Sequence, residues 1–244
     1  MAKKGSIRIG CSGWNYEHWR GLFYPAHSKA QDWFRYYARF FDTVEINNTF
    51  YQLPSAKTFT VWQAQAPDGF LYAVKASRYI THMKKLKEPE PALEKFLGRA
   101  RFLREHLGPI LYQLPPYWRL NFERLKFFLD LLPSEWLHVF EFREESWLVE
   151  EVFSLLDERG TSLCVHDLAG LRVPRRALGR IAYVRLHGAA GKYQGGYPEA
   201  VLRKWWGWME QQIMAGKDVY VYFNNDAEAH AVRDALRLKK MAGL

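Results

Sequence analysis

Hydrophobic and polar positions along the chain alternate between two periods. Short runs rich in β-branched and aromatic residues, bounded by turn residues, are typical of strands. They are Ile7–Cys11, Thr43–Asn47, Phe70–Lys75, Pro109–Gln113, His138–Arg143, Ser162–His166, Ile181–His187 and Val219–Asn224. Longer segments with a helical period lie between them and after the last. They are Ala30–Phe40, Lys57–Ala66, Pro91–His106, Phe122–Leu131, Trp147–Arg159, Pro198–Ala215 and Asp226–Leu238.

This strict alternation predicts an α/β fold. Parallel strands joined by helical crossovers, with no break in composition, indicate a single (β/α)8 TIM barrel over residues 1–244. The sixth unit differs, because the segment 167–180 is short and contains Pro174, so its helix is expected to be short or missing. A doubly wound open sheet is the structural alternative.

Composition supports a globular chain. Of 244 residues, 48% are hydrophobic and 25% are charged, which excludes disorder for most of the chain. No apolar run approaches the roughly 18 residues that a membrane span needs, and the basic start lacks an apolar leader, so we expect a cytoplasmic protein with no membrane partner. Cys11 and Cys164 are far apart and are expected to be free thiols.

The charge and the aromatic content admit two interpretations. The formal charge is +9, and aromatic residues make up 16%, including 10 Trp. Together they suggest a basic, aromatic surface that binds anionic partners. The alternative is that the aromatics fill the core and the lysines solvate helices.

Polar residues within the strands share one face. In Thr43–Asn47, Glu45 and Asn47 lie opposite Val44 and Ile46. The same alternation places further polar residues together on later strands: Glu141 with Arg143, Arg185 with His187, and Asn224 with two tyrosines; Lys75 and Gln113 end two more strands. Because the apolar face of a barrel strand packs on the outer helices, these side chains are expected to point inward and to end at the C-terminal mouth. The alternative is a barrel core sealed by salt bridges.

Three loops after strand ends carry candidate chemistry. Ser12–Ser28 is aromatic and contains Trp14, Ser77–Pro89 is basic and contains His82, and Gly188–Pro198 is glycine-rich and could present N–H groups to a phosphate. The segment Arg172–Arg180 is expected to be a solvated loop. Trp205, Trp206 and Trp208 are expected to pack a helix on the barrel or on a second copy, as a homodimer.

An ordered series of motifs resembles the YecE-like family, a prokaryotic domain of unknown function. The motifs are Ile9–Trp14, Phe23–Pro25, Thr43–Tyr51, Ile80–His82, Gln113–Pro116, Glu141–Arg143, Arg185–Gly188 and Tyr222–Asp226. The resemblance covers nearly the whole chain and implies a TIM barrel, but no reaction. A distant likeness of such barrels to the xylose isomerase and endonuclease-four superfamily is a fold-level analogy only. The chain departs from the family at Cys11, where Thr is usual, and at Glu144, where His is usual.

Two kinds of site chemistry compete. Arg143 and Arg185 are suited to clamping a phosphate or carboxylate, and Lys75 would add charge. His and carboxylate residues near the strand ends, among them His166 and Asp167, favour a divalent metal instead. Cations at the same ends oppose a metal, so the pattern suits an anion better. The basic run Lys84–Lys87 leaves nucleic acid open as a partner.

The function hypothesis is a hydrolase that acts on a phosphorylated or polyanionic substrate, and the alternative is a non-catalytic nucleic-acid or anion-binding protein. The predicted catalytic residues are Glu45, Glu141 and His187. The predicted ligand-binding residues are Trp14, Asn47, Tyr51, Lys75, His82, Gln113, Arg143, Asp167, Arg185 and Asn224. No cofactor is assigned, and a divalent metal stays open.

Overall fold

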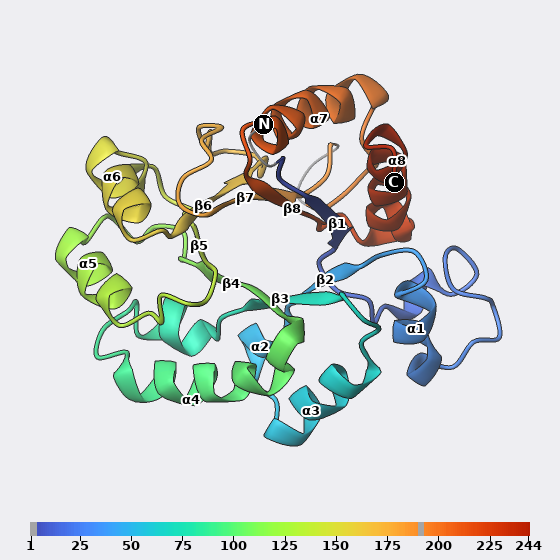
Figure 1. The fold of residues 1–244 in the computed structure, drawn as a ribbon, viewed down its shortest axis with the longest axis horizontal. Coiled ribbons are helices and arrows are strands. Elements are labelled where there is room, and N and C mark those ends of the chain that lie inside the picture. Colours follow the sequence, from blue (N-terminus) through green and yellow to red (C-terminus); the bar gives the residue numbers. More distant parts are fainter. Residues whose placement is uncertain (1–3, 190–192) are drawn as a thin grey trace. The chain divides into compact units, whose positions relative to one another are not determined.

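The fold class is α/β, a (β/α)8 TIM barrel (Figure 1). A computed structural model describes residues 4–189 and 193–244. Within them the strands form an eight-stranded sheet in the order β1-β8-β7-β6-β5-β4-β3-β2. From β2 to β8, strands adjacent in the chain are adjacent in the sheet, and β1 pairs in parallel with β8, as expected for a barrel.

The chain divides into two compact units, which are described separately. Unit 1 comprises Met1–Glu45, Val165–Arg175 and Ala182–Leu244, and unit 2 comprises Ile46–Cys164 and Arg176–Ile181. The elements of unit 1 are β1 (Ile7–Cys11), α1 (Ala30–Tyr37), most of β2 (Thr43–Ile46) and β7 (Ile181–Leu186), α7 (Glu199–Met214), β8 (Asp218–Phe223) and α8 (His230–Met241). The elements of unit 2 are α2 (Asn48–Tyr51), α3 (Ala56–Gln65), β3 (Leu71–Lys75), α4 (Glu90–Ala100), β4 (Leu107–Gln113), α5 (Phe122–Asp130), β5 (His138–Glu141), α6 (Glu150–Glu158) and most of β6 (Ser162–His166).

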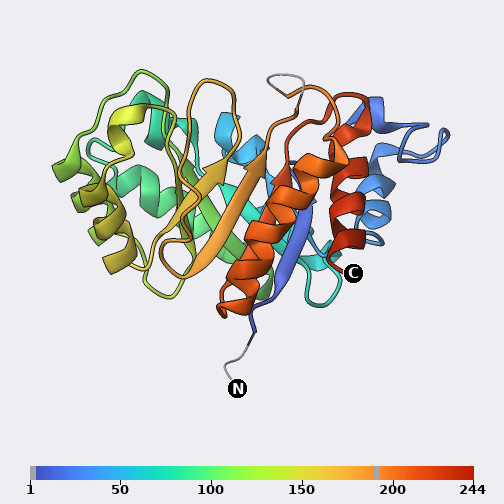
Figure 2. The same cartoon turned by 90° about the horizontal axis from the view of Figure 1, so that it is seen from above.

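In unit 1 the N-terminal strand depends on a close approach at Gly10. A Cβ at Gly10 would lie 2.3 Å from the Thr43 carbonyl oxygen, closer than real Cβ contacts, so only glycine fits there. The Tyr37 hydroxyl joins both segments, since it accepts the N–H of Cys11 at 2.8 Å and donates to Thr43 O at 3.0 Å. Helix α7 precedes β8 in the chain and packs beside it, and α8 follows β8 and packs beside β1 and β8 (Figures 1 and 2).

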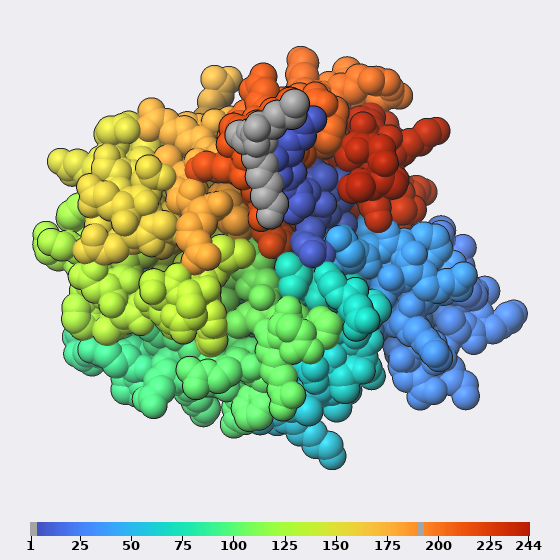
Figure 3. All heavy atoms as spheres, in the orientation of Figure 1, coloured from blue at the N-terminus to red at the C-terminus, as the bar shows by residue number. Residues whose placement is uncertain are grey.

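In unit 2 parallel pairing brings the ends of β3, β4 and β5 to one edge of the sheet. Lys75 of β3 pairs with Leu111 of β4, and Gln113 pairs with Glu141 of β5. Two helices begin at side-chain caps, because Ser55 accepts the N–H of Thr58 ahead of α3 and Asn121 does the same for α5. Figure 3 shows the side chains of α5 and α6 next to each other on one face.

The predicted elements are confirmed, with changes at the ends of strands and helices. The strands expected to end at Arg143, His187 and Asn224 end earlier, at Glu141, Leu186 and Phe223. No helix forms in the described segment 167–180, as Pro174 predicted. The expected helix Pro91–His106 is wrong in its second half, where Arg101–His106 forms a 3-10 segment and Arg104 has a φ of 50°. The expected helices at Trp147–Arg159 and Asp226–Leu238 begin later, at Glu150 and His230. The single domain over residues 1–244 stays a prediction.

The core contains many of the aromatic side chains that composition left unassigned. Buried tryptophans are Trp19, Trp33, Trp62, Trp118, Trp147 and Trp205. Core packing therefore accounts for much of the aromatic content. In residues 4–189 and 193–244, no helix has both the length and the apolar character that crossing a membrane demands.

Candidate functional site

Unit 2 gathers five of the predicted site residues at the carboxyl ends of β3, β4 and β5. We call this group, together with Phe50 of α2, the Lys75 cluster; its predicted members are Lys75, His82, Gln113, Glu141 and Arg143. The grouping follows from local rules. The strands are parallel, so residues at their carboxyl ends lie at one edge of the sheet.

Lys75 is held by a hydrogen bond and a ring. Its Nζ donates to Gln113 Oε1 at 2.7 Å and lies 4.2 Å from the centre of the Phe50 ring, a cation–π distance. The residue is 9% exposed. The Thr49 hydroxyl donates to the Lys75 carbonyl at 2.6 Å, which ties α2 to the end of β3. The ammonium group is therefore fixed in position.

Glu141 fixes the second cation of the cluster. Nε and Nη2 of Arg143 both contact Glu141 Oε1, and the Cys164 thiol donates to the other carboxylate oxygen at 3.7 Å. Glu141 is fully buried. A buried carboxylate bound in this way orients the guanidinium group of its partner.

His82 lies beside both cations. Its ring packs edge-on against Phe50 at 4.9 Å, and its Nδ1 lies 2.9 Å from the Thr81 hydroxyl. Burial, and next the charges of Lys75 and Arg143, lower the pKa of His82 to about 4. The imidazole is therefore neutral at physiological pH, and it is partly exposed.

In unit 1, Glu45 is saturated with buried donors. Its Oε1 accepts the Ser12 hydroxyl at 2.8 Å and Nη2 of Arg185 at 2.8 Å, and its Oε2 accepts the Tyr183 hydroxyl at 2.6 Å. The side chains of Glu45 and Arg185 are 0% and 1% exposed. Burial first, and then the Glu45 charge, raise the pKa of Tyr183 well above its usual range. Glu45 thus sits in a closed network of the kind that the salt-bridge alternative describes.

Asp167 forms a second network in unit 1, at the ends of β6 and β7. Its Oδ1 accepts the backbone N–H of His187 at 2.8 Å and lies 3.5 Å from His187 Nδ1. Its Oδ2 accepts the Tyr197 hydroxyl, which in turn accepts the N–H of Gly188 at 2.7 Å. The carboxylate is partly exposed, whereas the His187 side chain is 1% exposed. Asp167 is the member of this pair that a ligand would meet.

The remaining predicted ligand-binding residues have separate surroundings. Trp14 packs edge-on against Phe34 at 5.4 Å, and Asn224 donates its backbone N–H to Leu186 O at 2.7 Å. Asn47 is partly buried just before α2, and Tyr51 at the end of that helix is 71% exposed. All thirteen residue assignments stay predictions about function.

Sequence reasoning missed the partners that position the charges. Phe50 lies within the Thr43–Tyr51 motif, and Tyr197 lies within the glycine-rich loop. Both segments were identified, but neither residue was assigned a function. Gly191 and Lys192 of that loop lie outside the described residues. Long-range contacts of this kind leave no periodic signal in a sequence.

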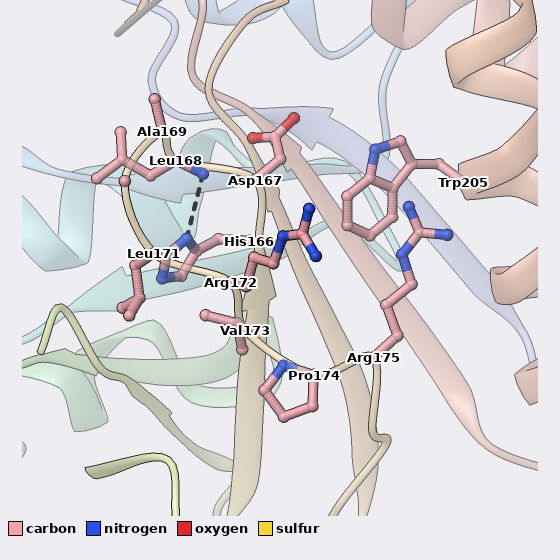
Figure 4. Close-up of a pocket in the computed structure, with 11 residues that line it drawn as sticks. His166, Asp167, Leu168, Ala169, Leu171, Arg172, Val173, Pro174, Arg175 and Trp205 are labelled. Atoms are coloured by element: carbon pink, nitrogen blue, oxygen red, sulfur yellow. Dashed lines mark hydrogen bonds between the residues drawn. The ribbon is translucent and has the colours of Figure 1, made fainter. Parts of the chain in front are cut away.

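A pocket in unit 1 was also missed. It has a volume of about 920 Å³ and lies between the segment 166–175 and Trp205 of α7 (Figure 4). Arg172 and Arg175 line it, although their segment was expected to be simply solvated. The expectation that Trp205 packs its helix is consistent with its burial. Among residues 4–189 and 193–244, no group of three or more His, Cys, Asp or Glu side chains is placed to hold a metal ion.

Fold and strand-end charges together define a (β/α)8 protein whose strand ends hold fixed, buried charges. Residues 8–244 match the family model described as "Protein of unknown function DUF72", and the chain belongs to this family. The resemblance to YecE-like proteins is confirmed by the UPF0759 protein YecE of Escherichia coli (strain K12), which is 29% identical over 167 residues. That alignment covers 66% of this chain, and the chain spans only 59% of the length of that YecE protein. The UPF0759 protein YunF of Bacillus subtilis (strain 168) is 24% identical, with 96% of this chain and 94% of YunF covered.

Solved structures support the fold. A DUF72 family protein from Thermotoga maritima has a TM-score of 0.87 and 29% identity, covering 98% of this chain and all of that chain. A DUF72 family protein from Enterococcus faecalis has a TM-score of 0.82 and 20% identity, covering 98% and 96%. These likenesses show the barrel fold, and the family model shows the family, whose function is not established.

Proposed function

We propose that this protein binds a phosphorylated or otherwise anionic small molecule at the Lys75 cluster. The observation that carries the proposal is the fixed placement of two cations at the ends of β3 and β5. Gln113 and Phe50 hold Lys75, and Glu141 holds Arg143.

Pre-positioned donors are suited to phosphate and carboxylate. A guanidinium group presents paired N–H donors that match the oxygens of such anions, and an ammonium group adds a point charge. Because hydrogen bonds already hold both groups, binding costs little side-chain entropy. The partly exposed His82 and Gln113 provide neutral hydrogen-bonding groups next to them.

Removing the Lys75 charge tests this proposal. Inorganic phosphate binding, measured by calorimetry, is expected to weaken about 10- to 100-fold in Lys75→Met, because a hydrogen bond to a charged group is lost. Lys57→Met is the matched control, since Lys57 is an exposed residue of α3 in the same unit. Equal affinity in Lys75→Met and Lys57→Met would contradict the assignment.

A pH dependence follows from His82. Its pKa is about 4 in the free protein, and a bound anion favours the protonated imidazole, so anion binding must raise that pKa. Affinity for sulfate, whose charge is constant over this range, is expected to be level above pH ~7 and to increase as the pH falls from ~6 toward ~4. In His82→Gln the increase should disappear. An unchanged increase in that variant would place the titrating group elsewhere.

The proposed activity is hydrolysis of the bound phosphoester. His82 is the best-placed proton acceptor in unit 2, because it is neutral, partly exposed and oriented by Thr81. Glu141, whose carboxylate is buried against Arg143, serves in this proposal by positioning that arginine. The non-catalytic alternative keeps the same anion site without turnover. A nucleic-acid partner, a homodimer, a metal and a cytoplasmic location stay predictions.

A further inference from the structure

The pocket next to Trp205 combines features that the Lys75 cluster lacks. It is built by unit 1 alone, from the helix-free connection after β6 and from α7. Its lining includes apolar side chains from Leu168 to Pro174, two arginines and one large aromatic ring. Its volume of about 920 Å³ is in the range of sites for drug-sized ligands.

The arginines and the indole ring of this pocket lie together. The Arg175 guanidinium is 4.0 Å from the centre of the Trp205 ring, a stacking arrangement. The Trp208 indole N–H donates to the Arg175 carbonyl at 3.2 Å, which fixes the backbone of that residue against α7. Figure 4 shows the guanidinium groups of Arg172 and Arg175 directed into the space beside Trp205. The Arg175 guanidinium therefore covers the buried Trp205 ring and offers its own flat face to the pocket, and the Arg172 guanidinium is directed into the same space.

One wall of the pocket supplies hydrogen-bonding side chains that are held in place by neighbouring groups. Asp167 lines the pocket, and its carboxylate is held by Tyr197 and by the backbone of His187. His166 Nδ1 accepts the N–H of Leu168 at 3.2 Å (Figure 4). A fixed carboxylate of this kind accepts hydrogen bonds from hydroxyl groups.

We propose that this pocket is a second small-molecule site, which binds a phosphate monoester carrying a planar aromatic ring, with a nucleoside monophosphate as the matching class. Arg172 and Arg175 take the phosphate through paired N–H donors. The ring stacks on the surface that Trp205 and Arg175 form. Asp167 accepts a hydrogen bond from a sugar hydroxyl. The proposal is independent of the function assigned to the Lys75 cluster.

Titration with adenosine monophosphate tests the proposal. To exclude binding at the Lys75 cluster, calorimetry is done in a Lys75→Met background. Adenosine monophosphate is expected to bind, and adenosine or inorganic phosphate alone at least about 10-fold more weakly, because each lacks one of the two recognised groups. Arg172→Gln should weaken binding of the nucleotide at least about 10-fold. Arg172 is exposed, so this change leaves the core intact.

Arg203→Gln is the matched control, since Arg203 is an exposed arginine on α7 that pairs with Glu199 and does not line the pocket. Its affinity for adenosine monophosphate should equal that of the Lys75→Met background. Trp205→Phe, checked for an unchanged melting temperature, should weaken the binding of adenosine monophosphate but not the binding of inorganic phosphate. No binding of the nucleotide, or equal binding in Arg172→Gln and Arg203→Gln, would overturn the proposal.

Discussion

Arg185→Met is expected to lower the free energy of unfolding by about 3–5 kcal/mol, because it leaves the Glu45 carboxylate buried without its cation. Both side chains are essentially unexposed, so water cannot replace the lost partner. Ser12 and Tyr183 would still donate to the carboxylate, but neutral donors do not compensate a buried charge. Denaturant unfolding, with the slope checked for constancy, measures the loss.

A double variant separates the cost of an unpaired buried charge from the cost of replacing the two side chains. Glu45→Gln combined with Arg185→Met removes both charges, and most of the lost stability is expected to return. Arg8→Met is the matched control in the same unit, because Arg8 pairs with the half-exposed Asp42 at 2.9 Å. That exposed pair should be worth at most about 1 kcal/mol. Similar losses of unfolding free energy for Arg185→Met and Arg8→Met would mean that the buried pair stabilises the fold no more than the exposed pair.

His82→Gln is expected to lower the turnover number for a phosphomonoester at least about 100-fold, the usual effect of removing a proton-transfer group. The amide of Gln keeps a hydrogen-bonding group of similar length, so substrate binding should change little. Hydrolysis of p-nitrophenyl phosphate and of a panel of sugar and nucleoside phosphates provides the measurement. The expected result is a loss in kcat with a nearly constant KM.

Glu141→Gln gives the contrasting result. If Glu141 positions Arg143, the variant should raise KM more than it lowers kcat, since the guanidinium group loses its fixed orientation. A loss confined to kcat in Glu141→Gln would instead make that carboxylate the proton-transfer group. Tight phosphate binding by the unaltered protein without turnover of any ester in the panel would contradict the hydrolase assignment and leave the binding function.

The Lys75 cluster shows how much of a site a sequence can predict. Lys75 and Gln113 each end a predicted strand, Glu141 lies near the end of a third, and parallel strands bring such ends to one edge. His82 was found in the same way, as a titratable residue in the loop that follows its strand. These inferences need only a period of two and a rule about barrel topology.

Strand periodicity and barrel topology could not predict which charged side chains pair with each other. Glu45 and Arg185 are 140 positions apart, and nothing in either segment marks them as partners. Glu45 and Glu141 bind their arginines as buried carboxylates, and their burial depends on packing by several elements. The pocket beside Trp205 was missed because a segment without periodicity looks solvated, whereas its stacking on α7 is a tertiary contact.

By itself the sequence predicted the order of strands and helices, a short or missing helix after the sixth strand, a barrel with an open sheet as the alternative, and the set of polar strand ends. These properties follow from local periodicity, from Pro174 and from the way parallel strands must connect. Only the tertiary structure decided which charges bind each other, which are buried and where a pocket opens. Those properties depend on distances between residues remote in the chain, and short-range patterns do not encode such distances.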